Sequence, residues 1–393
     1  MSNAIINTIE LQKTSSNGSS ILAATIHTTE GSNMYQTAAA EDIPSNNETT
    51  NKLQEQLTNA LAGIDAAHQQ EVDDILKQVL STTDNSADTV AALSSISIAA
   101  AKTAAQVLDV PLYEHLRNIS VTNGGSPIPL LYSSLVSGGS KGASPLAFQS
   151  FYIIPQTDNV RRSHKVIRDI KTALGTVLRL KTQENDLPIG SDGAYSPHSI
   201  EFNQEALELI LEGVAEAFPE VKIQLALNAN ANKFFKDGKY HLDQQSLSAQ
   251  QLHDYYDHLI ERFHVSSVED PFTADEFNEF HIMKQRHEDL DIVGGEVLES
   301  NSDILQVAQE EQGISAVSIS PNNSPTLSDM LAVIRSAHNA SLRCIIDHNY
   351  IETTEDFIAD LAVGCGCYGI KPGSPGTQES DEKFKRLMEI TQH

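Results

Sequence analysis

Apolar and polar side chains alternate over residues 3–11 and again over residues 20–28, and the turn-forming residues Ser-Asn-Gly-Ser lie between them at 16–19. A period of two is typical of a strand that buries one face, so this pattern predicts a β-hairpin. The next segment, residues 30–50, is rich in Ser, Thr, Asn and Glu. We expect a mobile loop there.

Two helical stretches follow at roughly 50–80 and 86–108, and the second is unusually rich in alanine. Residues 122–127 then have the sequence Thr-Asn-Gly-Gly-Ser-Pro, whose turn-forming residues are typical of a linker. We therefore place a domain boundary at this point. It divides the chain into an N-terminal α+β domain at 1–122 and a larger domain at 123–393.

In the larger domain, short apolar runs typical of strands alternate with helical stretches. The strand-like runs are 221–227, 265–268, 290–293, 315–319, 342–346 and 367–370, and further helices are expected near 302–311, 326–339, 354–362 and 380–391. Ser248 is expected to cap one helix, and Thr273 with Glu276 to form a capping box for the next. Such alternation predicts an α/β fold with parallel strands. Six successive units favour a closed barrel, and a doubly wound sheet stays as the alternative.

Composition narrows the classes of partner. The chain has 393 residues, with 26 Lys plus Arg against 53 Asp plus Glu, and a formal charge of −27. A surface this acidic repels nucleic acid and anionic lipid, so neither is an expected partner. The N-terminal sequence lacks the pattern of a secretory signal and no apolar run suggests a membrane span, so we expect a cytoplasmic protein.

The three cysteines are Cys344, Cys365 and Cys367. An odd and sparse set of this kind predicts neither a disulfide framework nor a zinc site. We expect packed thiols, with a redox-active pair of Cys365 and Cys367 as the less favoured alternative.

Polar residues follow the predicted strands, at the end of a barrel where chemistry is usually found. These positions are Asn228, Glu269, Glu296 after two glycines, Ser320, Asp347 with His348, and Lys371. We expect these side chains to surround one barrel mouth.

Several segments resemble enolases, and they occur in the enolase order. They are VPLYEHL (110–116), SGGS (137–140), KFFKDGKY (233–240), VEDPF (268–272), TTEDFIADLAVG (353–364) and IKPG (370–373). The resemblance covers nearly the whole chain and is weakest in the first 80 residues. It implies a modified eight-stranded β/α barrel after a small α+β domain, and a homodimer. The family dehydrates 2-phosphoglycerate to phosphoenolpyruvate, and Mg²⁺ stabilises the negative charge of the enediolate that forms.

The resemblance implies that most of the metal site and the general base are replaced. The three metal carboxylates of the family correspond to Asn228, Glu269 and Gly295, with Glu296 as a substitute ligand at the next position. A site with one assured carboxylate would bind Mg²⁺ weakly or not at all. The lysine that removes the proton corresponds to Ser320. Loss of a positioned base typically costs about 10²–10⁴-fold in rate.

Other positions are retained in part. Lys371 matches a second family lysine that contacts substrate and metal, and His348 matches a family histidine. Asp192, in a glycine-rich loop, takes the place of the glutamate that assists the leaving hydroxyl. We therefore expect Lys371, His348 and Asp192 to be the remaining catalytic positions.

The substrate-binding positions also differ. The arginine and serine that bind the substrate phosphate in the family correspond to Asn349 and Tyr350, and a mobile-loop histidine corresponds to Lys141. Exchanging a guanidinium for an amide removes a bidentate and permanently charged contact to phosphate. We expect a ligand that is polar or less anionic than 2-phosphoglycerate.

Three hypotheses follow. The first is a non-catalytic enolase-like protein, a pseudoenzyme that acts by binding or assembly. The second is an active Mg²⁺-dependent phosphopyruvate hydratase or related lyase with a rebuilt site, in which Lys371 or His348 is the base. The third is a structural partner of an active enolase or of a larger assembly, which rests on the resemblance alone.

Overall fold

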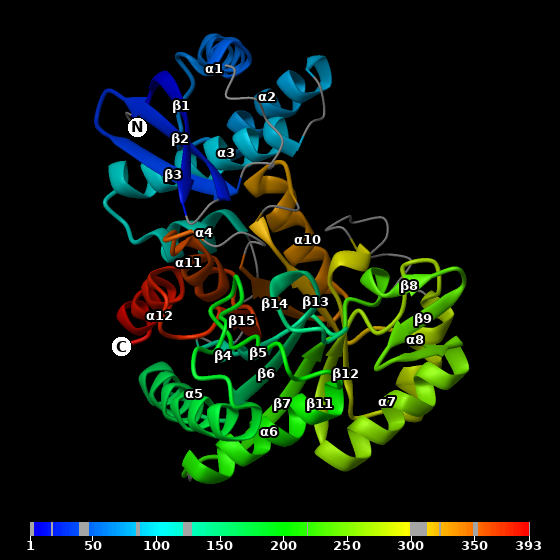
Figure 1. Cartoon of the computed structure of the whole chain (residues 1–393). Coiled ribbons are helices and arrows are strands. Elements are labelled where there is room, and N and C mark those ends of the chain that lie inside the picture. Colours follow the sequence, from blue (N-terminus) through cyan, green and yellow to red (C-terminus); the bar gives the residue numbers. More distant parts are fainter. Residues whose placement is uncertain are drawn as a thin grey trace.

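The computed structural model describes most of the chain, arranged as a small domain above a barrel (Figure 1). The described residues are 4–16, 19–38, 47–83, 87–120, 128–217, 219–298, 313–321, 324–348 and 353–392. The boundary expected at residue 122, the helix expected at 302–311, and Asn349 and Tyr350 lie outside these residues.

The N-terminal domain is a three-stranded antiparallel sheet covered by helices. Its elements are β1 (Ile6–Ser16), β2 (Ser19–Thr28), β3 (Ser32–Ala38), α1 (Asn47–Leu61), α2 (Gln69–Thr82), α3 (Ala87–Val107) and α4 (Leu112–Ser120). Pairing of β1 with β2 confirms the predicted hairpin. The prediction of a loop over 30–50 is wrong at 32–38, because these residues form β3 and pair with β2. Most of β3 is polar, yet Tyr35 and Thr37 on this strand are buried.

The alanine-rich helix α3 is the core helix of this domain and packs against β2 and β3. Its segment Thr89–Val107 is long and apolar enough to cross a membrane by length and composition, contrary to our expectation. However, 72% of that segment is buried inside the protein, as in a helix that forms a domain core. The helical stretch at 50–80 is two helices, because α1 ends before Gly63, which has a positive φ of 87°.

The larger domain is a barrel whose sheet has the strand order β4-β15-β14-β13-β12-β11-β7-β6-β5. Its strands are β4 (Leu130–Leu131), β5 (Ser133–Ser137), β6 (Ser150–Pro155), β7 (Ile223–Asn228), β11 (Val265–Glu269), β12 (Asp291–Gly294), β13 (Ala316–Ile319), β14 (Arg343–Asp347) and β15 (Gly369–Lys371). Strand β6 is antiparallel to both of its neighbours, and the pairs from β7 through β15 to β4 are parallel. Strands β4 and β5 flank Tyr132, so the ends of the sheet are consecutive in the chain and the barrel closes.

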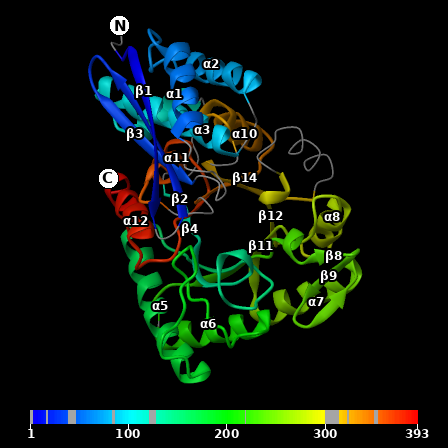
Figure 2. The same ribbon diagram turned by 45° about the horizontal axis from the view of Figure 1, so that its top comes forward.

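Helices cover the outside of the barrel (Figure 2). They are α5 (Val160–Thr182), α6 (Asn203–Ala217), α7 (Ala249–Phe263), α8 (Phe277–Arg286), α10 (Leu327–Asn339), α11 (Phe357–Gly364) and α12 (Gln378–Ile390). Short 3₁₀ helices are η1 (Gly139–Lys141), η2 (Ala231–Lys233) and η3 (Glu296–Leu298), and a small sheet contains β8 (Phe235–Lys236), β9 (Lys239–Leu242) and β10 (Gln245–Leu247).

One of the two predicted helix caps is present. Ser248 caps α7 and forms a reciprocal capping box with Gln251. The capping box expected from Thr273 and Glu276 is wrong, because α8 begins at Phe277 and Glu276 is itself the cap residue. The Thr273 hydroxyl donates to the Glu276 carboxylate at 3.2 Å within the preceding turn.

Side chains of the N-terminal domain accept hydrogen bonds from the first turn of α10. This barrel helix lies beside α2 and α3 (Figures 1 and 2). The first amide groups of a helix have no partner within it. Here the Leu327 N–H donates to the Ser97 hydroxyl, and the Ser328 N–H donates to the buried Asp73 carboxylate, each at 2.8 Å. Burial raises the pKa of Asp73, while hydrogen bonds from Ser328, Ser97 and neighbouring Gln69 oppose that rise.

Candidate active site at the barrel mouth

A cavity of about 90 Å³ lies at the C-terminal ends of the barrel strands. It is lined by Lys141, Gln149, Asn228, Glu269, Asp270, Gly295, Glu296, Ser318, Ser320, Asp347 and His348. Strand register brings distant residues together here, because Glu269 pairs with Asn228 on β7 and Asp347 pairs with Lys371 on β15. The structure therefore groups most of the strand-end residues that we predicted.

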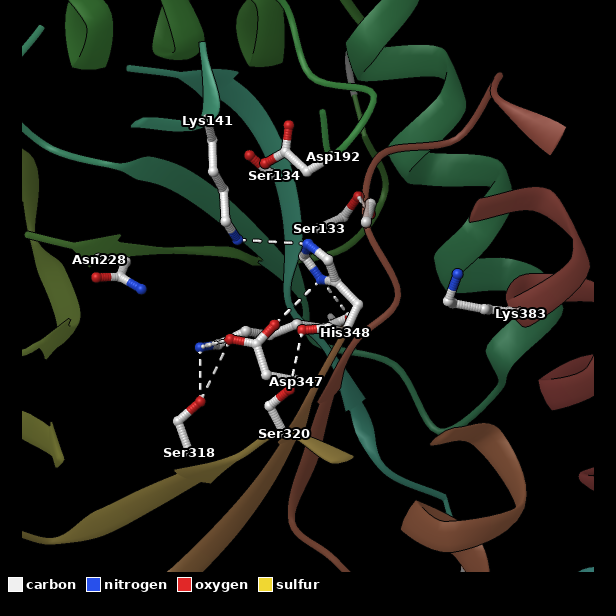
Figure 3. A network of polar contacts seen from close by, with 12 residues as sticks. Ser133, Ser134, Lys141, Asp192, Asn228, Ser318, Ser320, Asp347, His348 and Lys383 are labelled. Carbon is white, nitrogen blue, oxygen red and sulfur yellow. Dashed lines mark hydrogen bonds and ion pairs between the residues drawn. The ribbon is translucent and has the colours of Figure 1, made fainter. Parts of the chain in front are cut away.

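Lys371 is the centre of this group, with a side chain that is 1% exposed. Its ammonium contacts a carboxylate oxygen of Glu269, the Asp347 carboxylate at 2.7 Å and the Ser318 hydroxyl at 2.8 Å. Figure 3 shows Asp347 and Ser318 close together, and the Ser318 hydroxyl lies 3.4 Å from the Asp347 carboxylate. A lysine ammonium has three N–H donors, so each donor has an acceptor here.

The electrostatics keep Lys371 protonated. Burial opposes its charge, but the carboxylates of Asp347 and Glu269 raise the pKa of Lys371 well above its usual value. In return, although burial opposes ionisation, Lys371 and then His348 hold the pKa of Asp347 well below its usual range. Lys371 is therefore a bound cation and has no lone pair to accept a proton.

A second corner of the cavity is formed by Asn228, Glu269 and Gly295. The Asn228 amide N–H donates to Glu269 Oε1 at 2.9 Å, so both Glu269 oxygens already have partners. The Asn228 carbonyl oxygen is buried and has no hydrogen-bond partner in the part of the chain that the structure describes. A β-carbon at Gly295 would lie 2.7 Å from Glu269 Oε1, so the glycine allows this carboxylate its position.

Asp270 and Glu296 add acidic groups beside this corner. Asp270 adopts a φ of 46° and accepts a hydrogen bond from the Gly295 N–H at 2.7 Å. Burial, and then the charge of Glu269, raise the pKa of Asp270 to about 8. Glu296 is half-exposed and pairs with Lys233 at 3.2 Å. The acidic corner thus extends from the cavity interior to its rim.

His348 and Lys141 form the opposite, basic part of the cavity. His348 Nδ1 lies 3.1 Å from the Lys371 carbonyl oxygen and 3.1 Å from Asp347 Oδ1. Both are acceptors, so we assign the ring hydrogen to Nδ1. The Nε2 lone pair then accepts from the Lys141 ammonium at 3.3 Å, the contact drawn in Figure 3. The lone pair that His348 would need as a base is therefore engaged.

Lys141 is buried, with an exposed fraction of 7%. Burial opposes its charge, but the surrounding acidic groups, Tyr152 first and then Asp347 and Asp192, raise the pKa of Lys141. Lys141 is therefore a protonated ammonium inside the cavity.

Comparison with known proteins identifies the family. The family model described as "Enolase, C-terminal TIM barrel domain" matches residues 126–393, and "Enolase, N-terminal domain" matches residues 11–116. The chain belongs to the enolase family. Among curated enolases, that of Methanocaldococcus jannaschii is 29% identical over 84% of this chain and 77% of its own length. That of Methanosarcina barkeri is 30% identical over 84% of this chain and 76% of its own length.

Of the expected residues of this enolase-family barrel, Asp192 lies outside the cavity and Ser320 lies in its lining. Asp192 is buried but does not line the cavity, because it accepts hydrogen bonds from Ser137 at 2.6 Å and from the Ala194 N–H at 3.1 Å. Ser320 does line the cavity, and its hydroxyl lies 3.5 Å from the His348 carbonyl oxygen. The two hydrogen bonds of Asp192 thus stabilise its own loop and join it to β5.

Three members of the cavity were not among our predicted site residues. They are Gln149, Asp270 and Ser318. Ser318 had a signal in the sequence, because it lies two positions before Ser320, on the same strand face. The inward direction of Asp270 depends on its positive φ, which the sequence does not indicate.

Proposed function

We propose that this enolase-family protein binds a small ligand in the barrel mouth and does not dehydrate 2-phosphoglycerate. The observation that supports this most strongly is the state of Lys371, whose three donors meet Glu269, Ser318 and Asp347. Dehydration begins with removal of a weakly acidic proton, which requires a positioned group with an available lone pair. Lys371 offers none.

The two other candidate bases are equally poor. His348 carries hydrogen on Nδ1 and directs its Nε2 lone pair to Lys141. Ser320 offers a hydroxyl near a carbonyl oxygen, and a serine becomes a base or nucleophile only when a neighbouring base activates it.

The residues present are also a poor fit for Mg²⁺, the metal that the family implies. Mg²⁺ requires near-ideal octahedral oxygen ligands and loses water reluctantly. At the three strand ends, this chain supplies the Asn228 amide, the Glu269 carboxylate and no side chain at Gly295. Glu269 is already bonded to Asn228 and to the Lys371 ammonium, which would repel a divalent cation.

A binding role is favoured by the cavity itself. It combines a buried ammonium, acidic groups and a buried acceptor for which the described residues supply no partner. Polar groups that converge in a pocket are the usual basis of small-molecule recognition.

The test is an assay of purified full-length protein with 2-phosphoglycerate and Mg²⁺, following phosphoenolpyruvate by its ultraviolet absorbance. We expect no rate above a buffer control, while an active enolase assayed in parallel turns over. Mg²⁺-dependent formation of phosphoenolpyruvate would overturn the proposal. The variant Ser320→Lys is expected to stay inactive, because the metal positions are also replaced.

A second candidate function is a lyase with a rebuilt site, and Asp270 is the observation that favours it. A carboxyl group with a pKa of about 8 that lines the cavity has the basicity of a general base near neutral pH. If the assay detects turnover, Asp270→Asn should abolish it, with a loss of at least about 10²-fold. Turnover that survives this substitution would exclude Asp270 as the base.

A further inference from the structure

We propose that the ligand of this cavity is a small zwitterion of the amino acid class, with its carboxylate at Lys141 and its ammonium group at Asn228. The inference rests on the proposed function and names the ligand class for the same site. It follows from two buried residues that line one cavity, Lys141 and Asn228. Among the described residues, the Lys141 ammonium has donors to spare and the Asn228 carbonyl oxygen can still accept a hydrogen bond.

The anion-binding end is Lys141. Among the described residues, the structure gives its ammonium one side-chain hydrogen-bond partner, His348 Nε2. That partner is a neutral acceptor, so it takes one of three donors and leaves the charge without an anion in direct contact. A buried ammonium in this position stabilises a carboxylate that enters the cavity. Lys371 differs, because Glu269 and Asp347 already contact it.

The cation-binding end is the corner at Asn228. Its carbonyl oxygen is buried and has no hydrogen-bond partner among the described residues, and Asn228 is 5% exposed. Leaving such an acceptor unsatisfied costs about 1–3 kcal/mol, so a ligand donor is favoured there. Glu269 and Glu296 line the same cavity, and their negative charges favour a cationic donor over a neutral hydroxyl.

The two ends together define the class. A simple carboxylate would satisfy Lys141 and leave the Asn228 oxygen among acidic groups, whereas a simple amine would leave Lys141 without an anion. A phosphate dianion would bring excess negative charge against Glu269 and Glu296. The cavity of about 90 Å³ has room for a ligand of a few non-hydrogen atoms.

The test is titration calorimetry of the full chain with matched small molecules. The zwitterions are glycine, L-alanine and L-serine. Their hydroxy-acid counterparts are glycolate, L-lactate and D-glycerate, and their amine counterparts are methylamine, ethylamine and ethanolamine. We expect at least one zwitterion to bind, with its two counterparts at least tenfold weaker. Equal affinity for a zwitterion and its hydroxy acid, or no binding of any zwitterion, would overturn the inference.

Variants locate the binding. Lys141→Met should weaken binding of the zwitterion at least tenfold, and Asn228→Leu should do the same. Lys239→Met changes an exposed lysine of β9 and should leave affinity unchanged. Thermal unfolding of each variant without ligand checks that it folds. An affinity that survives Lys141→Met in a folded protein would refute the assignment of the carboxylate.

The outcome is separable from that of the proposed function. Turnover of 2-phosphoglycerate would overturn the proposed function, whatever the calorimetry shows. Absence of zwitterion binding in a protein without turnover would overturn the ligand class alone.

Discussion

Replacing Lys371 by methionine is the most direct perturbation of the barrel mouth, because it removes the ammonium and keeps an apolar side chain of similar length. Two carboxylates, Glu269 at 6% and Asp347 at 14% side-chain exposure, would then lie close together without that cation. Removing one partner of a buried ion pair costs about 3–5 kcal/mol, because the remaining charge is uncompensated. We therefore expect Lys371→Met to destabilise the fold by about this amount.

The loss should be visible in thermal unfolding. Unfolding entropy is roughly 2.1 cal/mol/K per residue, or about 0.8 kcal/mol/K for the 393 residues of this chain. The expected decrease in Tm is therefore about 4–6 °C. The double variant Lys371→Met with Glu269→Gln removes one of the two charges and should recover part of the loss. A matched control is Lys165→Met, which breaks an exposed ion pair with Asp169 and should change stability by less than about 1 kcal/mol.

The reasoning also predicts a pH dependence. Without the ammonium, the two carboxylates repel each other, so their pKa values rise in the folded variant. The folded variant then binds more protons than the unfolded chain, and its stability increases as pH falls toward the usual carboxyl range. A Tm of Lys371→Met within about 1 °C of the parent protein at neutral pH would refute the view of Lys371 as the structural cation of the site.

Three further predictions concern other parts of the fold. Asp73→Ala should lower the free energy of unfolding by about 2–3 kcal/mol, because it leaves buried donors of α10 and its neighbours unsatisfied, and chemical denaturation measures this. Burial lowers the pKa of Lys171 to about 8. Between about pH 8 and the usual lysine pKa the unfolded chain therefore binds more protons than the folded protein, so stability should rise with pH over that range. The variant Lys171→Met should lose this rise. The three cysteines are buried, and burial raises the pKa of Cys344 and Cys365 to about 12. A thiol reagent should therefore label the native protein slowly and the unfolded protein fast. Rapid labelling of the native state would contradict this.

Much of the fold was predictable because the barrel strands are short apolar runs with polar ends. The runs predicted at 265–268 and 342–346 match β11 and β14 to within one residue at each end. Strand β3 was not predictable, because its exposed face is polar and its buried residues are Tyr35 and Thr37, a pattern that a loop also shows. Its identity depends on packing against β2, which the local sequence does not encode.

The sequence predicts which residues form the site, but not which of them contact one another. The sequence indicates that Glu269 and Lys371 end strands, yet the contact between them joins residues 102 positions apart. Which acceptors surround an ammonium depends on barrel closure and side-chain direction. The direction of the His348 lone pair likewise depends on the Lys371 carbonyl oxygen, a backbone atom that no residue pattern specifies.

The cap on α10 has a consequence for the order in which the protein is made. Asp73 leaves the ribosome some 255 residues before its partner Ser328. Within the N-terminal domain the Asp73 carboxylate accepts hydrogen bonds from Gln69 and Ser97, and the Ser328 N–H is added when α10 docks. Docking adds hydrogen bonds from Ser328, which favour the ionised carboxylate and oppose the rise that burial causes in the pKa of Asp73. A barrel expressed without the N-terminal domain would display α10 with its first amide groups open to water, which couples the two domains in folding.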